Sequence, residues 1–295
     1  MYYPFSENKN LKVTDEQLIS SVAGGDKLSL EKLIKRHQDW IYNLVFHMVC
    51  NPEDAKDITQ EILIKIITKL GTFRGKSSFR TWVYRIAINH IFDVNRKKQK
   101  VIKKLNFIRY GKEIDETPDM ELPDSKGLPV DSSLLVKEVK LSCIHGMLRC
   151  LDDNHRIVFI LGAVFYIPDK TGAEILKITE VNYRKRLSRA RNSVYSFMNE
   201  KCGLIHPENT CLCRKKTKAL LDSGNINPSN LIFNSEYNYV IKEIVAKKLE
   251  DLNSFVDEKC ENLIYGYPFL NSPDYISHFR KLLNTAEFKK IFNLN

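Results

Sequence analysis

Residues 54–104 read DAKDITQEILIKIITKL, then GTFRGKSSFRTWVYRIAINHIFDVNRKKQK, then VIKK. In the first part Ile58, Ile62 and Ile66 recur every four residues, which predicts one apolar stripe along a helix. Asn51 is a suitable cap for the start of this helix, and the proline after it stands where no backbone amide is needed. The stretch therefore predicts two helices joined by a short loop.

The loop and the second helix combine aromatic rings, hydroxyls and cations. The second helix is predicted over residues 79–100, and it ends in a basic run. Any base can stack on an aromatic face, and Lys and Arg neutralise phosphates, so this composition suits single-stranded DNA. The same rings could instead be ordinary packing anchors, because helical apolar periodicity usually marks a core.

Composition limits the class of protein. The 295 residues are enough for two or three domains, and the net charge of +10 favours nucleic acid over a membrane surface as partner. No apolar run approaches the roughly 20 residues that span a bilayer, and no signal peptide is recognisable, so we expect a cytoplasmic protein without membrane insertion. Seven cysteines, an odd number spread over a long chain, indicate free thiols or a metal site and not a disulfide framework.

A second motif lies further along the chain. TGAEILKI (171–178) predicts a short helix, Thr179-Glu180 a turn, and VNYRKRLSRARNSVYSFM (181–198) a long helix with five cations in the eight positions 184–191. Two helices joined by a tight turn, with cations on the second, are typical of the helix-turn-helix, whose second helix enters the DNA major groove. Val181 and Leu187 are expected to face the domain.

Both motifs resemble a known family, the extracytoplasmic-function (ECF) sigma factors of the sigma-70 family. These are small promoter-recognition subunits of bacterial RNA polymerase. Residues 54–70 and 73–98 are similar to sigma region 2. AEIL at 173–176 and RLSRAR at 186–191 are similar to sigma region 4.

The resemblance, together with the helical periodicity and composition of the rest of the chain, implies an all-α fold with four parts. They are a sigma region 2 helical bundle at residues 14–104, a flexible acidic linker at 105–132, a sigma region 4 helix-turn-helix domain at 133–200, and a helical C-terminal extension at 201–295 that the family pattern does not cover. Within the extension we expect amphipathic helices at 234–252 and 272–292, the latter starting at Ser272-Pro273.

The resemblance also implies three sets of contact residues. The polymerase-binding set is Asp57, Gln60 and Glu61. The set for the minus-ten promoter element is Phe73, Arg74, Lys76, Ser77, Ser78, Phe79, Arg80, Asn89, Arg96 and Lys97. The set for the minus-thirty-five element is Glu180, Asn182, Tyr183, Arg184, Arg186 and Arg189. Two residues depart from the family pattern: Gly172 weakens its helix by up to about 1 kcal/mol, and Tyr183 is bulkier than expected.

The extension opens with a group of metal-ligating residue types, Cys202, His206, Cys211 and Cys213. A basic loop favours thiolates and could wrap a tetrahedral zinc ion, the one cofactor that the sequence suggests. The spacing is not that of a standard zinc finger, so free cysteines on a linker remain an alternative.

The sequence shows no nucleophile–base constellation and no phosphate-cradling glycine loop, so we expect a protein that is not an enzyme. The resemblance implies that it directs core RNA polymerase to promoter DNA for transcription initiation, and it leaves room for an anti-sigma factor. Two alternatives stay open: a stand-alone helix-turn-helix transcriptional regulator, and a metal- or redox-sensing regulator that acts through the extension.

Overall fold

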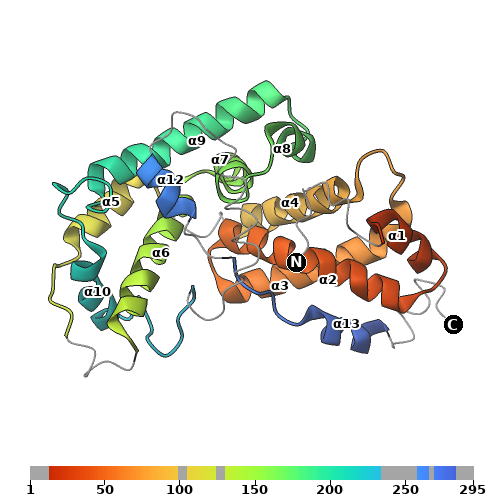
Figure 1. The fold of residues 1–295 in the computed structure, drawn as a ribbon, viewed down its shortest axis with the longest axis horizontal. Helices are drawn as coiled ribbons and strands as arrows, with labels where there is room; N and C mark the ends of the chain where they lie inside the picture. Colours follow the sequence, from red (N-terminus) through yellow and green to blue (C-terminus); the bar gives the residue numbers. More distant parts are fainter. Residues whose placement is uncertain (1–12, 99–104, 124–129, 234–257, 266–268, 284–295) are drawn as a thin grey trace. The chain divides into compact units, whose positions relative to one another are not determined.

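The computed structural model describes residues 13–98, 105–123, 130–233, 258–265 and 269–283. The protein is all-α, as predicted (Figure 1). Its chain divides into two compact units, described separately below. The first unit draws on residues 1–100, 173–177 and 271–295, and the second on residues 101–172 and 178–270.

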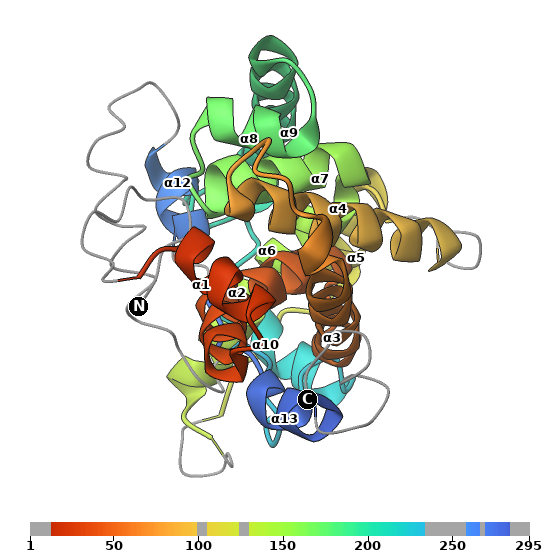
Figure 2. The same cartoon turned by 90° about the vertical axis from the view of Figure 1, so that its right-hand side faces the viewer.

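The first unit is built around one long helix. Its helices are α1 (Asp15–Ala23), α2 (Lys27–Val49), α3 (Pro52–Lys69), the short η1 (Leu70–Thr72), α4 (Phe79–Lys98) and α13 (Tyr275–Leu283). Helices α1, α3 and α4 all pack on α2, whose central residues are almost completely buried (Figures 1 and 2).

Side-chain caps fix the starts of α1 and α3. Thr14 and Gln17 form a capping box at the start of α1. Asn51 accepts a hydrogen bond from the backbone N–H of Asp54, and Pro52 occupies the first turn of α3. The start of α3 therefore lies where the sequence predicts it.

The second unit contains the helix-turn-helix motif. Its elements are α5 (Phe107–Glu116), α6 (Ser132–Cys150), α7 (Asp153–Phe159), the π-helical turn η3 (Ile160–Val164), α8 (Asp169–Leu176), α9 (Glu180–Lys201), α10 (Cys213–Asp222) and α12 (Glu258–Tyr265). Helix α7 packs on α9, and α10 packs on α6. The last four residues of α8 are grouped with the first unit.

Helix α5 lies inside the stretch for which the sequence predicts a flexible linker, so that prediction is wrong for residues 107–116. The Tyr110 ring stacks on Phe197 of α9, with 5.8 Å between ring centroids. The Tyr110 hydroxyl donates to the carbonyl of Cys143, and a Cβ on Gly146 would lie 2.3 Å from that hydroxyl. The acidic and proline-rich composition of the following residues concealed a short amphipathic helix that α6 and α9 hold in place.

The described part of the C-terminal extension is divided between the two units. Its described residues up to Leu270 group with the second unit, and those from Asn271 to Leu283 group with the first. The buried carboxylate of Glu138 on α6 accepts hydrogen bonds from the backbone N–H groups of Ile232 (2.6 Å) and Phe233 (3.1 Å). This buried acid thus ties residues 232 and 233 of the extension to α6, on which α10 also packs.

The structure can be compared with the helices that the sequence predicts in the extension. The helix expected at 234–252 lies outside the described residues. Helix α13 starts at Tyr275 and not at Ser272-Pro273, because the Asp274 carboxylate accepts from the backbone N–H of Ser277 and caps it. Helices α10 and α12 were not predicted.

Candidate nucleic-acid interface

The loop before α4 ends in a cluster of three aromatic rings. Phe73, Phe79 and Trp82 lie 5.4 to 5.6 Å apart, measured between ring centroids. Phe73 and Trp82 are half-buried, whereas Phe79 is only 1% exposed. The Phe79 ring is therefore not accessible to a DNA base, and we correct its assignment from base contact to packing anchor.

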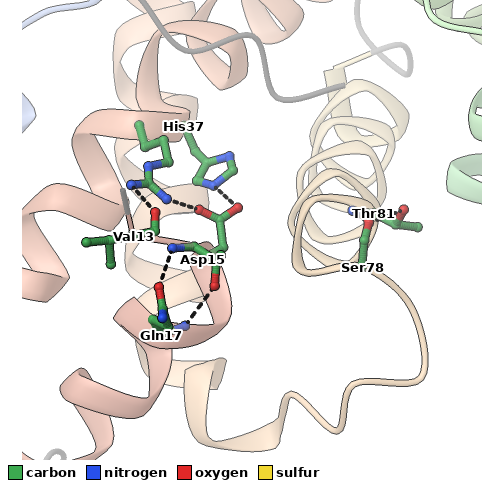
Figure 3. Close-up of polar contacts among 8 residues, drawn as sticks. Val13, Asp15, Gln17, His37, Ser78 and Thr81 are labelled. Atoms are coloured by element: carbon green, nitrogen blue, oxygen red, sulfur yellow. Dashed lines mark hydrogen bonds and ion pairs between the residues drawn. The ribbon is translucent and has the colours of Figure 1, made fainter. Parts of the chain in front are cut away.

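A buried ionic network supports this anchor (Figure 3). The Asp15 carboxylate contacts Nη1 of Arg36 at 2.7 Å and Nε2 of His37 at 3.1 Å, and the His37 ring meets Phe79 edge-on at 5.6 Å. Burial by itself raises the pKa of Asp15, but His37 and then Arg36 outweigh it and lower the pKa to about 2. Asp15 therefore stays ionised. The sequence analysis missed this network because Asp15 lies 21 and 22 residues from its two partners.

The start of α4 is fixed by a hydroxyl that the sequence assigned to DNA. Ser78 Oγ accepts from the backbone N–H of Thr81 at 3.2 Å, and the two hydroxyls lie 2.9 Å apart (Figure 3). Such a contact satisfies one of the unpaired amides at a helix N-terminus. Ser78 remains exposed, so capping leaves its other side open to solvent.

The cations and amides of the predicted minus-ten set remain accessible. Arg74 is exposed and donates to the carbonyl of Gly71 at 3.0 Å, which directs its side chain along the loop. Arg80 and Ser77 are half-buried. The fully exposed members of the set, besides Arg74 and Ser78, are Lys76, Asn89, Arg96 and Lys97.

The predicted polymerase-binding residues lie on α3. Asp57 and Glu61 are exposed and Gln60 is half-buried. Glu61 is held by α4, since Nε2 of His90 lies 2.7 Å from its carboxylate. Gln60 Nε2 lies 2.9 Å from Nε2 of His278 on α13, a contact that the sequence did not suggest.

Helix α9 presents the second cationic surface. Thr179 caps it by accepting from the backbone N–H of Asn182 at 3.2 Å. Arg184 pairs loosely with Glu180 at 3.6 Å and both stay about half exposed, so the pair contributes little stability. Of the predicted minus-thirty-five set, Glu180, Asn182, Arg184 and Arg189 are exposed, Arg186 is half-buried and Tyr183 is buried.

Tyr183 is the second correction to the predicted contacts. It is 0% exposed, and the packing residue predicted in its place, Val181, is 51% exposed. A Cβ on Gly172 would lie 2.4 Å from Cζ of the Tyr183 ring, and a Cβ on Gly162 would lie 3.2 Å from its hydroxyl. The two departures from the family pattern thus compensate for each other, because the missing side chain at 172 makes room for the larger ring at 183.

The cysteine group does not show the geometry of a metal site. Among the described residues, no set of three or more His, Cys, Asp and Glu side chains could hold a metal ion. His206 is exposed, while Cys202 and Cys211 are joined by a backbone bridge. Burial raises the pKa of Cys213 to about 12. The zinc hypothesis therefore gains no geometric support.

Comparisons with known proteins converge on one family. A family model described as Sigma-70 region 2 matches residues 33–101. The RNA polymerase sigma-H factor of Pseudomonas aeruginosa is 27% identical over 184 residues, which are 61% of this chain and 91% of that protein. The ECF RNA polymerase sigma factor SigW of Bacillus subtilis is 27% identical over 186 residues, 60% of this chain and 92% of that protein.

Together these findings support an ECF sigma factor of the sigma-70 family. The similarity to the sigma-H factor and to SigW runs over nearly the whole length of those proteins, so it includes more than the matched region 2. A solved structure of CnrH in complex with the cytosolic domain of CnrY aligns with 63% of this sigma factor and 97% of that chain, at 18% identity and a TM-score of 0.46. None of the described helices combines the length and apolar content needed to cross a membrane.

Proposed function

We propose that this sigma factor recruits core RNA polymerase through α3 and recognises the two promoter elements through separate cationic surfaces. In this proposal residues 14–104 act as region 2, residues 133–200 as region 4, and the extension at 201–295 as an addition to both. The work is binding and DNA strand separation without a chemical step by the sigma factor itself, and it takes place in the cytoplasm.

The observation that carries the proposal is the exposure pattern of the two cationic helices. In α9, Tyr183 and Leu187 are buried while Arg184 and Arg189 are exposed, so one face packs and the other is available to a duplex. Exposed cations near the N-terminus of a recognition helix are placed to reach base edges and phosphates of a minus-thirty-five element.

The region 2 surface combines exposed cations with partly accessible rings. Phe73 and Trp82 are half-buried, and Arg74 and Lys76 are exposed. An open ring face and neighbouring cations are what a single-stranded minus-ten element requires. Asn89, Arg96 and Lys97 extend this accessible surface along α4.

Reversal of one charge on α3 tests polymerase docking. We expect Asp57→Lys to weaken binding to bacterial core RNA polymerase by about tenfold, because an interfacial charge pair becomes a like-charge contact. Asp57 is chosen over Glu61 because Glu61 also holds His90. The measurement is a titration of labelled full-length sigma factor with core polymerase.

Glu16→Lys on α1 makes the same charge change at an exposed position away from α3 and serves as the control. Equal affinities for wild type, Asp57→Lys and Glu16→Lys would contradict docking through α3. If folded wild type does not bind core polymerase, the stand-alone regulator becomes the better explanation.

A further inference from the structure

Helix α13 belongs to the C-terminal extension, yet it packs on the region 2 unit. In both views it runs beside α2 and α3 (Figures 1 and 2), and its contacts with α2 are within that unit. Tyr275 and Phe279, one helical turn apart, are 2% and 1% exposed. Residues at this spacing share one helix face, so two aromatic side chains anchor α13 to region 2.

Polar contacts surround these two anchors. The Tyr275 hydroxyl donates to the carbonyl of Lys56 on α3 at 3.0 Å. The Ser272 hydroxyl donates to the Asp39 carboxylate on α2 at 2.6 Å. These contacts hold the N-terminal end of α13 against both α2 and α3.

The C-terminal half of α13 is held by a paired charge. The Arg280 guanidinium donates to both carboxylate oxygens of Glu31 on α2, at 2.6 and 2.7 Å. The hydrogen bond from Arg280 lowers the pKa of Glu31, despite an opposing effect of burial. This two-point geometry is specific for an Arg–carboxylate pair and fixes the register of α13 on α2.

Helix α13 occupies part of the proposed polymerase-binding surface. Gln60 belongs to that surface and contacts His278 at 2.9 Å. The negative charge of Asp57 acts on the Tyr275 hydroxyl, whose pKa is raised chiefly by burial and further by this charge. A partner that binds Asp57 and Gln60 therefore meets α13 on the same side of α3.

We propose that α13 is an autoinhibitory helix that competes with core RNA polymerase for the Asp57 and Gln60 side of α3. This proposal rests on the proposed function, because it takes α3 as the docking helix. The nine described residues of α13 are fewer than an isolated helix needs to be stable in water, so this segment depends on its contacts with α2 and α3. Such a segment can leave without unfolding the core beneath it.

The proposal has a quantitative consequence. A protein whose binding-competent state is only fractionally populated binds with an affinity reduced by that fraction. If α13 is docked in about nine of ten free molecules, its release strengthens polymerase binding by about tenfold.

The decisive experiment releases α13 in the full-length chain. We expect Tyr275→Ala with Phe279→Ala to bind bacterial core RNA polymerase about tenfold more tightly than wild type, because both anchors are lost. Circular dichroism checks that the helical core is retained. Unchanged or weaker binding by this folded double variant would overturn the proposal.

A charge swap tests the same contact without touching the core. Arg280→Glu alone and Glu31→Arg alone should each strengthen polymerase binding by about two- to threefold, because each turns the pair into a like-charge contact. The double variant Glu31→Arg with Arg280→Glu restores opposite charges and should return to wild-type affinity. Equal affinity for all four proteins would overturn the proposal even if the aromatic variant fails to fold.

The two proposals fail in different ways. If wild type and released variants bind polymerase equally well, only autoinhibition is overturned and the docking function stands. If none of the folded proteins binds core polymerase, docking through α3 is overturned, and the competition proposed for α13 is overturned with it.

Discussion

The starts of α4 and α9 look alike in sequence, since each places an aromatic residue among cations, but they bury that ring in different ways. Phe79 packs against Phe73, Trp82 and His37. Tyr183 instead fills space that Gly172 and Gly162 leave open. An aromatic residue in a basic segment is thus no evidence of base stacking until its burial is known. The region around Phe79 should be sensitive to loss of a side chain, and the region around Tyr183 to an added side chain at Gly172.

Loss of the ring at Phe79 should have the largest effect. We expect Phe79→Ala to lower the free energy of unfolding by about 3–5 kcal/mol, because a fully buried ring leaves a cavity in the core. The measurement is denaturant unfolding of the full chain, followed by tryptophan fluorescence. Phe73→Ala removes a half-buried ring from the same cluster and should cost clearly less. Equal decreases in the free energy of unfolding for Phe79→Ala and Phe73→Ala would show that Phe79 is not the main anchor of the cluster.

The ionic network beneath Phe79 should make this region sensitive to acid. The pKa of Asp15 is lowered from 3.8 to about 2 in the folded protein, so its ionised form contributes about 2 kcal/mol above the unfolded pKa. That contribution is lost as the pH falls from about 4 toward 2.

Comparison of wild type with Asp15→Asn isolates the contribution of ionised Asp15 to the free energy of unfolding. The difference between their free energies of unfolding should shrink by about 2 kcal/mol between pH 6 and pH 2. A difference that stays constant over this range would contradict an ionised, paired Asp15.

Addition of one methyl group should test the α9 region, with the smallest net effect. Gly172→Ala gains helix propensity of up to about 1 kcal/mol but places a Cβ against the stiff Tyr183 ring, which costs about 1–3 kcal/mol. We expect a net loss of stability of about 1 kcal/mol, seen as faster hydrogen exchange of α9 amides. Tyr183→Leu in the Gly172→Ala background should relieve the clash between the new Cβ and the ring. Slower hydrogen exchange of the α9 amides in Gly172→Ala alone would contradict this prediction.

Much of the helical framework could be predicted because its signals are local. The capping box at Thr14, the Asn51-Pro52 start of α3 and the turn before α9 all depend on residues within one helical turn. The resemblance to the sigma family also placed both cationic helices correctly. Of the predicted contact residues, Phe79 and Tyr183 are the two that the structure buries.

What could not be predicted depends on contacts between distant residues. Nothing near Tyr183 in the sequence reveals that Gly172 accommodates its ring, so periodicity alone assigned packing to Val181 in error. Helix α5 is hidden by acidic neighbours, and α13 is defined by partners more than 200 residues away. Such pairings follow from tertiary packing and leave little trace in the local pattern.

The buried carboxylate of Glu138 determines where this chain can be shortened. A protein that ends near residue 200 would keep this acid in its interior without the two amide donors of Ile232 and Phe233. Loss of these two hydrogen bonds would destabilise the second unit, so such a truncation would report on damage to that unit as well as on regulation. An end after Leu270 keeps the Glu138 anchor and removes α13, and it is the cut that separates regulation from folding.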